Sequence, residues 1–476
     1  MKIKNYDVTD SLAKAKKILA AKKMDQETRA MFQLLITLIE LMASLFGANS
    51  KNSSKPPSQD PHREKPVKEK SARKAGGQPG SEGRTLKQTS RPDEVVFLGV
   101  DRRTLPRGES YTECKPEKRQ VFDVKLSVFV TEYQAEVLVD GKGRKYVAPF
   151  PTGVTAPVQY GSGVRSLACY LSCFQMLPFE RLKAFFNEHL LLPISTGTLA
   201  HIRAEAAAKL EDFEKAARIA LLRAGLLFCD ETGINVAGKN RWIHCASSTQ
   251  WTLLVPHEKR GKKAADDIGV LGLYQGIMIH DNWPFYFKYT DCSHALCNAH
   301  QIRELTRISE DNGKKWAAKM IVFLQELNKE VQDSSGKLTE SIQLERRKTY
   351  RKILASGEKE EPRETPPPAG KRGRQKQTRS RNLLDRLITR ENETLLFMTE
   401  VDVPFTNNQG ERDQRMTKVK QKVSGTYKTL ETAKDDARIR SFISTCTKHG
   451  VSVADALNDI FRGKNPDFVT KMLQDS

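Results

Sequence analysis

Two acidic residues follow short apolar runs, where their side chains could do metal chemistry. In LLFCDETG the apolar run Leu226–Cys229 stops at Asp230, which predicts a buried strand that ends at a carboxylate. In LGLYQGIMIHDNWPFY a second apolar run leads through His280 to Asp281. A carboxylate at the exit of a buried strand is costly unless it is hydrogen-bonded, paired or bound to a cation, so a metal ligand and an acidic turn are the two interpretations.

A third carboxylate lies in VPFTNNQGERDQRMTKVKQKVSG. Asn407 or Asn408 can cap a helix that carries Glu411 in its first turn. Hard divalent cations bind several carboxylate oxygens, and nucleic-acid phosphates bind Arg and Lys. The same helix supplies basic residues that we predict to contact DNA: Arg412, Arg415, Lys418, Lys420 and Lys422.

These segments, with HALCNAHQIREL just after the second, resemble the insertion-sequence-66 (IS66) family of bacterial DDE transposases. Other stretches resemble that family's signatures in the same order: NSSKPPSQD, GGQPGSEGRTL, QYGSGVRSLACYLSCFQMLPFERL and LLPISTGTL. The resemblance covers most of the chain and implies an RNase H-like catalytic core. In such a core Asp230, Asp281 and Glu411 would be the catalytic residues and would hold two Mg²⁺ ions, for which Mn²⁺ can substitute.

The resemblance implies a transposase that cuts transposon ends and joins the 3′-hydroxyl to target DNA. It also implies binding to terminal repeats and target DNA, a homo-oligomer, and accessory proteins of the same element. Two alternatives are a transposon-derived DNA-binding protein without cleavage activity and an RNase H-like nuclease without strand transfer. Occupation of all three acidic positions favours the transposase over the first alternative, because a chain free of catalytic selection could lose any of them.

The composition agrees with a nucleic-acid partner. The 476-residue chain is long enough for several domains, and its net charge of +21 favours a polyanion. Its eight cysteines are scattered, and MKIKNYDVTD lacks the apolar part of a signal peptide. No stretch is long and apolar enough to span a bilayer. We therefore expect a cytoplasmic protein that does not associate with a membrane, and the resemblance implies a bacterial protein that associates with the nucleoid.

The expected fold class is α+β multidomain, with an RNase H-like mixed-sheet catalytic core that contains an all-helical insertion. The predicted segments are an N-terminal helical segment (1–47), a basic disordered linker (48–92), a small β unit (93–155), a helical region (156–222), the first part of the core (223–310), the helical insertion (311–401), and the second part of the core with C-terminal helices (402–476).

Residues 10–47 predict helix with a break near Asp25. The stretch carries an apolar stripe with coiled-coil spacing: Met31, Leu34, Leu38, Leu41 and Leu45. The stripe either joins two chains as a zipper or packs on its own protein, and the resemblance favours the zipper. The linker that follows is rich in Ser, Pro, Gly and Lys. It is either a solvated tether or a segment that binds along the phosphates of the nucleic-acid backbone.

The next segment has the alternation of β-strands. Apolar and polar residues alternate over Val121–Val130 and Glu132–Val139, and Asp140-Gly141 predicts a hairpin turn before Arg144–Val147. The resembling family often carries a zinc ribbon at this position. Because Cys114 stands alone, without a Cys-x-x-Cys pair, we predict a degenerate ribbon without structural zinc.

Three short helices are predicted over 160–222, the second opened by Pro178 and the third capped by Ser195 or Thr196. These helices form either a helix-turn-helix module for transposon ends or a packing layer. The sequence has no recognisable base-reading face that would decide between the two.

In the core, Arg241–Ala246 and Trp251–Val255 predict antiparallel strands. The strand that ends at Asp281 should join the sheet beside the strand that ends at Asp230, with a helix delivering the third carboxylate. Helix is predicted over 295–333 and resumes through Leu383, Leu384, Leu387 and Leu395, after the basic stretch 362–380.

Cys297 and His300 form a Cys-x-x-His pair that shares one helical face. The pair could bind zinc, but two ligands make no site unless others come from elsewhere in the chain. We interpret the pair, together with Asn407 and Asn408, as residues that support the core near Asp281.

Overall fold

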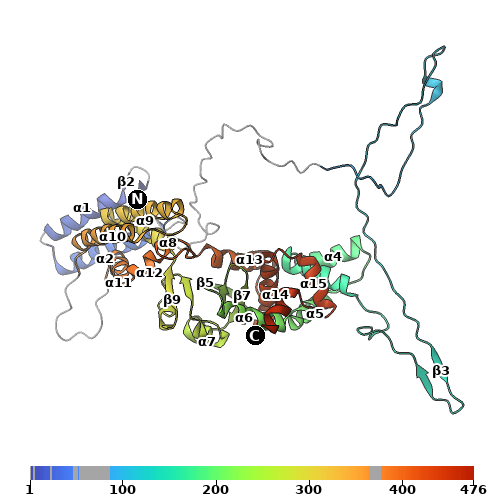
Figure 1. The fold of residues 1–476 in the computed structure, drawn as a ribbon. Helices are drawn as coiled ribbons and strands as arrows, with labels where there is room; N and C mark the ends of the chain where they lie inside the picture. The colour runs from blue at the N-terminus through green and yellow to red at the C-terminus, as the bar shows by residue number, and fades with distance from the viewer. Residues whose placement is uncertain are drawn as a thin grey trace. The chain divides into compact units, whose positions relative to one another are not determined.

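The structure is a computed structural model that describes residues 2–3, 6–21, 24–46, 52, 86–363 and 377–475. Contacts divide the chain into two compact units, Glu64–Ala148 and a larger unit of Met1–Arg63 with Pro149–Ser476 (Figure 1). Most of the linker predicted over 48–92, and the middle of the basic stretch 362–380, lie outside the described residues. No described helix combines the length and the apolar character needed to cross a bilayer.

The N-terminal residues form a pair of helices, as predicted. Asp25 begins the second helix, because its Oδ1 accepts a hydrogen bond from the Thr28 N–H at 2.8 Å and satisfies a donor of the first turn. The predicted break near Asp25 is confirmed. The elements are β1 (Lys2–Ile3), β2 (Tyr6–Asp7), α1 (Val8–Ala21) and α2 (Gln26–Phe46).

The apolar stripe of α2 is open to solvent in this pair of helices. Met31 and Leu34 are each 61% exposed and Leu38 is 49% exposed, whereas Ile36 on the opposite side of the helix is 8% exposed. The side chains of Leu41 and Leu45 lie outside the described residues. An exposed apolar stripe favours the zipper between two copies, which stays a prediction.

Replacing Leu34 and Leu38 by Lys should weaken self-association, because two ammonium groups would enter the apolar contact. Sedimentation of the full chain measures the effect, and the mass should fall towards that of one chain. Gln33→Lys, which adds a charge beside the stripe, is the control and should leave the mass unchanged. An unchanged mass for the double variant would rule out the zipper.

The unit Glu64–Ala148 contains a predicted hairpin. Strands β3 (Val137–Val139) and β4 (Lys145–Val147) pair antiparallel, and a 3₁₀ turn, η2 (Arg102–Thr104), precedes them. Asp140 closes the turn, because its Oδ1 accepts hydrogen bonds from the Lys142 and Arg144 N–H groups, each at 2.9 Å. The hairpin prediction at Asp140-Gly141 is confirmed.

The strand predicted over Val121–Val130 is wrong, and the strand predicted over Glu132–Val139 shortens to β3. Val121, Phe129 and Val130 are 93%, 91% and 82% exposed, so no described layer covers the apolar side of this segment. Alternation favours a strand only where one face packs against something, and that packing is what the segment lacks.

A five-stranded mixed sheet forms the centre of the larger unit. Its order is β7-β6-β5-β8-β9; β5, β6 and β7 are antiparallel, and β8 runs parallel to both β5 and β9. The predicted antiparallel strands and the neighbouring positions of β5 and β8 are confirmed. The strands are β5 (Leu226–Val236), β6 (Lys239–Ser247), β7 (Thr252–His257), β8 (Ile277–His280) and β9 (Ser293–Leu296).

Strand β9 was not predicted. Its last two residues fall where the predicted helix 295–333 was expected to begin. Its sequence, SHAL, has no β-branched residue, and the parallel ladder with β8 is what holds it extended. Short elements fill the connections on either side of β8: α7 (Lys262–Ile268), η4 (Leu271–Leu273) and η5 (Tyr286–Lys288).

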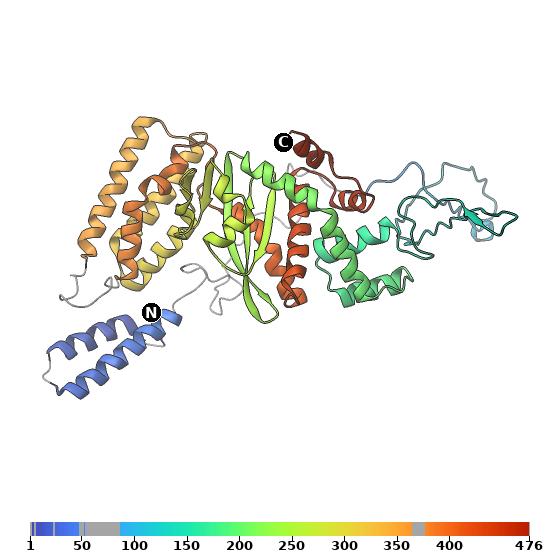
Figure 2. The same ribbon diagram turned by 90° about the horizontal axis from the view of Figure 1, so that it is seen from below.

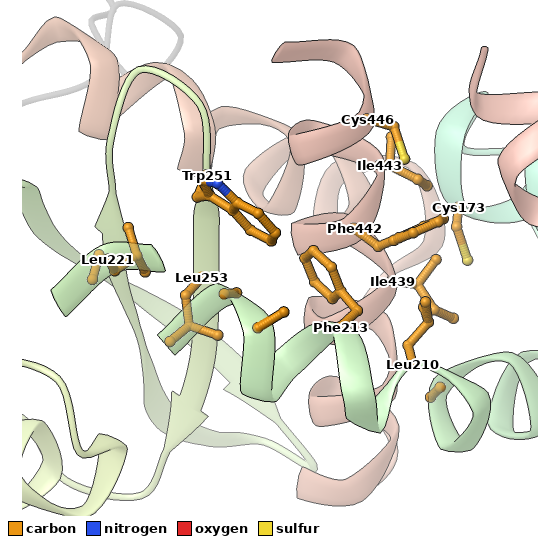
Figure 3. Packing of buried hydrophobic residues seen from close by; sticks show 14 of the residues in the cluster. Cys173, Leu210, Phe213, Leu221, Trp251, Leu253, Ile439, Phe442, Ile443 and Cys446 are labelled. Atoms are coloured by element: carbon orange, nitrogen blue, oxygen red, sulfur yellow. The ribbon is translucent and has the colours of Figure 1, made fainter. Parts of the chain in front are cut away.

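The helices before the sheet share one apolar core with the C-terminal helices (Figure 3). Phe213 stacks against Trp251 at a ring-centroid distance of 6.1 Å and meets Phe442 edge-on at 5.3 Å. This shared core favours the packing layer over the helix-turn-helix module. The helices are α3 (Ser162–Cys169), which continues as the π-helix η3 (Tyr170–Phe174), α4 (Phe179–His189), α5 (Thr196–Lys209), α6 (Glu211–Leu222), α14 (Leu430–Lys448), α15 (Val453–Phe461) and α16 (Asp467–Gln474).

Helix α14 protects the edge of the sheet at β7. The Thr252 N–H donates to Thr445 Oγ1 at 3.1 Å, and the Leu254 N–H donates to Ser441 Oγ at 2.8 Å. Side-chain hydroxyl groups therefore take the place of a further strand along this edge and leave it closed to pairing with another chain.

The insertion between β9 and the last part of the core is helical, as predicted. It has its own apolar core around Trp316 and Tyr350, which Phe228 of β5 and Ile279 of β8 join to the sheet. Figure 2 shows it beside the sheet in yellow and orange. Its elements are α8 (Asn298–Asn312), α9 (Lys315–Asp333), α10 (Glu340–Glu360), α11 (Arg379–Thr389), α12 (Glu391–Leu395) and η6 (Leu396–Met398); α13 (Asn408–Ser424) then returns to the sheet.

Candidate active site

Asp230 lies within a strand and not at its end. Strand β5 continues to Val236 along β6, so the prediction that it stops at Asp230 is wrong. Only the parallel pairing between β5 and β8 ends near this point. The last residue pair in it is Phe228 opposite Ile279. Two residues further on, Asp230 in β5 and Asp281 just after the end of β8 stand at the same level.

Asp230 is electrostatically coupled to the two other predicted carboxylates. Burial raises the pKa of Asp230 to about 7, and the charges of Glu231, Asp281 and Glu411 add to the rise, while His300 opposes it. Such interactions weaken with distance, so Asp281 and Glu411 lie in the neighbourhood of Asp230. The structure thus places Asp281 and Glu411 near enough to Asp230 to influence its pKa, although the ligand atoms of the three acids do not all lie within 4.8 Å of one another. Their catalytic role stays a prediction.

Backbone N–H groups orient the two aspartates. Asp281 Oδ1 accepts a hydrogen bond from the Trp283 N–H at 3.0 Å, in the turn that follows β8. Asp230 Oδ1 accepts one from the Glu231 N–H at 2.9 Å. Each bond limits the rotation of a carboxylate that is already partly buried.

Glu411 is positioned by the start of α13, where Asn407 occupies the N-cap. The Asn407 side chain does not cap the helix. Its Nδ2 donates to the backbone oxygen of Cys229 at 2.7 Å, and the Asn407 N–H donates to Cys297 Sγ at 3.1 Å. The helix that carries Glu411 is therefore tied to the residue just before Asp230.

Cys297 completes this connection. Its N–H donates to the backbone oxygen of His280 at 2.9 Å, and His280 immediately precedes Asp281. The Asn407–Cys297 pair thus links the residues before both aspartates to the start of the helix of Glu411. These contacts agree with the predicted supporting role of Asn407 and Cys297, whereas Asn408 is exposed on the outer side of α13.

Gly410 lies close to the side chain of Asn407. A Cβ atom at position 410 would lie 3.0 Å from Asn407 Oδ1 and 3.3 Å from its Nδ2. Any larger residue would push against the side chain that reaches Cys229. The glycine of the NNQGE stretch therefore leaves room for the connection between α13 and β5.

His300 lies beside Glu411. Its Nε2 is 3.9 Å from Glu411 Oε1, and Arg303 Nη1 is 3.8 Å from the same oxygen. Burial lowers the pKa of His300, but its hydrogen bond with Cys297 and the charges of Cys297 and Glu411 outweigh burial and raise it to about 9. Two positively charged side chains therefore face the third carboxylate.

Glu231, the other acid of DETG, is buried on the face of β5 opposite to Asp230. Its Oε2 is 3.4 Å from Arg260 Nη2, and the Arg260 guanidinium lies over the rings of Trp242 and Trp283 at 4.6 and 3.3 Å. Burial, followed by the charge of Asp281, raises the pKa of Glu231 to about 7. Sequence reasoning missed Arg260, because one basic residue in a charged turn carries no local signal.

The predicted DNA-contacting residues do not all lie on one side of α13. Four of them are exposed: Arg412, Arg415, Lys418 and Lys422. The face of α13 that carries Glu411 continues through Arg415, Lys418 and Lys422. Lys418 Nζ also donates to the backbone oxygen of Gly233. Lys420 is 6% exposed, donates to the Ser172 oxygen at 3.0 Å and lies 4.0 Å from Asp436, so it faces the interior and cannot reach a phosphate.

A comparison with known protein families identifies the larger unit. The model of the Transposase IS66 family matches residues 157–435, which is more than half of the 476 residues and includes Asp230, Asp281 and Glu411. Residues 15–87 match a family of unknown function, DUF6444. No curated protein and no solved structure matches the chain significantly. The family match agrees with the mixed sheet and with the order of the acidic segments, and the chain therefore belongs to the IS66 family of transposases.

Proposed function

We propose that the chain is an active DNA transposase that cuts transposon ends and joins the 3′-hydroxyl to target DNA. The observation that supports this proposal is that Asp281 and Glu411 both raise the pKa of Asp230, near the edge where β5 and β8 part. Membership of the IS66 family gives this electrostatic coupling its chemical meaning, because the family acts in DNA transposition.

The donor set suits a pair of hard divalent cations. Three carboxylates offer the oxygen ligands that Mg²⁺ and Mn²⁺ prefer, and their mutual repulsion is relieved when a cation lies among them. Glu411 Oε1 is a buried atom without a hydrogen-bond partner, which leaves a lone pair for such an ion. When bound, two Mg²⁺ ions would activate the attacking oxygen and stabilise the leaving oxygen of a phosphoryl transfer.

The residues of the chain supply position and charge. Asp230 and Asp281 are held by backbone N–H groups, and Glu411 is held by the tie between Asn407 and Cys229. Arg415 and Lys422 extend from Glu411 along the exposed side of α13. A DNA backbone that enters the site would meet these cations next to the carboxylates, which would hold the scissile phosphate in place.

A strand-transfer assay on DNA that carries the element's ends tests the function. Incubation of the purified chain with Mg²⁺ should release 3′-hydroxyl ends and then join them to a target plasmid. Cleavage without joining would instead support the RNase H-like nuclease. Binding without any cleavage would support the transposon-derived DNA-binding protein. The same assay with accessory proteins of the element present tests whether they are partners.

Reversing the charges of Arg415 and Lys422 with glutamate should weaken DNA binding and make it less sensitive to salt. Each lost phosphate contact lowers the slope of log K against log [salt] by about one. Fluorescence anisotropy at several salt concentrations measures both effects. The matched control reverses Lys215 and Lys434, two exposed lysines in surface ion pairs with Asp212 and Glu431. Equal losses in the two variants would show that net charge, and not this face of α13, binds DNA.

A further inference from the structure

Three metal-binding side chains from two helices meet beside the carboxylate cluster. Cys297 is the N-cap of α8, His300 lies in its first turn, and Glu411 lies in the first turn of α13. Their ligand atoms all lie within 4.8 Å of one another. No other three His, Cys, Asp or Glu side chains among the described residues bring their ligand atoms this close together. Glu411 is thus the third ligand that the Cys-x-x-His pair lacks in the sequence.

The polar atoms of this group are incompletely satisfied. His300 Nδ1 and Glu411 Oε1 are buried without a hydrogen-bond partner, and the charged neighbours of Glu411 stand at 3.8 Å or more. Cys297 Sγ accepts a hydrogen bond from the Asn407 N–H at 3.1 Å, an interaction that orients a sulfur ligand. A cation that displaces the protons of His300 and Cys297 would satisfy the atoms that no hydrogen-bond partner reaches.

The donor types select the kind of cation. Thiolate and imidazole ligands favour Zn²⁺ and similar ions, whereas Mg²⁺ prefers oxygen ligands and keeps much of its water. Three protein ligands and one open position are the ligand count of a zinc site that also binds water. His300 and Glu411 are partly exposed, so an ion can enter from solvent.

We propose that Cys297, His300 and Glu411 form a second cation site that takes Zn²⁺ and that its occupation withdraws Glu411 from Asp230 and Asp281. Zn²⁺ would then inhibit the Mg²⁺-dependent reaction. The inhibition rests on the proposed function, but the binding site does not. The two parts can therefore be tested separately.

Binding is tested with Co²⁺ as a spectroscopic substitute for Zn²⁺, in the full chain carrying Asp230→Asn and Asp281→Asn. These changes disable the carboxylate pair and leave the three proposed ligands in place. Titration at mildly alkaline pH, where His and Cys release their protons more readily, should give a sulfur-to-cobalt charge-transfer band that saturates at one ion per chain. Zn²⁺ should bleach the band and Mg²⁺ should not.

Two further variants identify the ligands. Cys297→Ser should abolish the band, and His300→Ala, which leaves the contact between Cys297 and Asn407 intact, should weaken Co²⁺ binding at least about tenfold. Cys446→Ser is the control, because Cys446 and His449 have the same sequence spacing but form no such group. No band, or a band that survives Cys297→Ser and His300→Ala, would overturn the proposal.

The inhibition is tested with the parent chain. Micromolar Zn²⁺ added to a reaction in excess Mg²⁺ should suppress DNA cleavage, and His300→Ala should require about tenfold more Zn²⁺ for the same loss. Identical inhibition of parent and variant would show that Zn²⁺ acts elsewhere. An inactive parent chain would refute the proposed function and leave the cobalt result untouched.

Discussion

Asp281→Asn should reduce cleavage and strand transfer to background, with either Mg²⁺ or Mn²⁺. The substitution removes the charged ligand but keeps its shape. The asparagine oxygen can still accept the hydrogen bond that Trp283 N–H donates to Asp281 Oδ1 at 3.0 Å, so the turn after β8 should survive. A metal site is worth several kcal/mol of transition-state stabilisation, which corresponds to a loss of about a thousandfold or more.

Binding to DNA should be unchanged in this variant, because the exposed basic residues of α13 are untouched. A gel-shift assay run beside a single-turnover cleavage assay separates the two properties. Asp291→Asn is the matched control: Asp291 lies between the same two strands, β8 and β9, but is exposed. It should behave like the parent. Cleavage by Asp281→Asn at the parental rate would show that the carboxylate site lies elsewhere in the chain.

Asn407→Ala should slow cleavage by about a hundredfold although Asn407 is not itself a ligand in the proposed mechanism. The change removes the donor that reaches the Cys229 oxygen at 2.7 Å, so the start of α13 is no longer held against β5. Glu411 lies one turn further on, and a displacement of about 1 Å at a reacting centre costs about a hundredfold in rate. The half-saturating Mg²⁺ concentration should rise as well, because the carboxylates no longer meet.

Asn408→Ala is the control, since its side chain is exposed on the same turn. Gly410→Ala should reproduce part of the loss, because its methyl group would press on Asn407 from 3.0 Å. Thermal unfolding of each variant separates mispositioning from loss of fold. If Asn407→Ala keeps the parental rate and Mg²⁺ dependence, the Asn407–Cys229 contact does not position Glu411.

The features that the sequence determined by itself are those with a local cause. The break at Asp25, the hairpin at Asp140-Gly141 and the start of α5 at Ser195 follow from side chains that bond to backbone groups two to four residues away. The pairing of β5 with β8 follows from two apolar runs that must be buried together. Such signals lie within a few residues and can be detected without knowing the fold.

Predictions from the sequence pattern failed where the local structure depended on a packing partner far away in the sequence. The alternation at Val121–Val130 has no described layer to cover it and forms no strand, while SHAL becomes β9 because β8 lies beside it. Lys420 belongs to a run of similar basic residues, but only the packing of α13 turns it towards Ser172 and Asp436. The side of a helix that faces the core is a property of the assembled layers.

The candidate site also has features that the sequence reveals and features that only the tertiary structure reveals. Asp230 and Asp281 could be noticed in the sequence because buried strands rarely carry unneeded charge, and Glu411 was selected through the resemblance to the IS66 family. Only the tertiary structure joined Cys229, Cys297 and Asn407, which are separated by 68 and 110 residues, or placed His300 and Cys297 against Glu411. Hydrogen bonds and ligand groups between segments this far apart leave no periodic trace, because their geometry exists only when the sheet and both helices have packed.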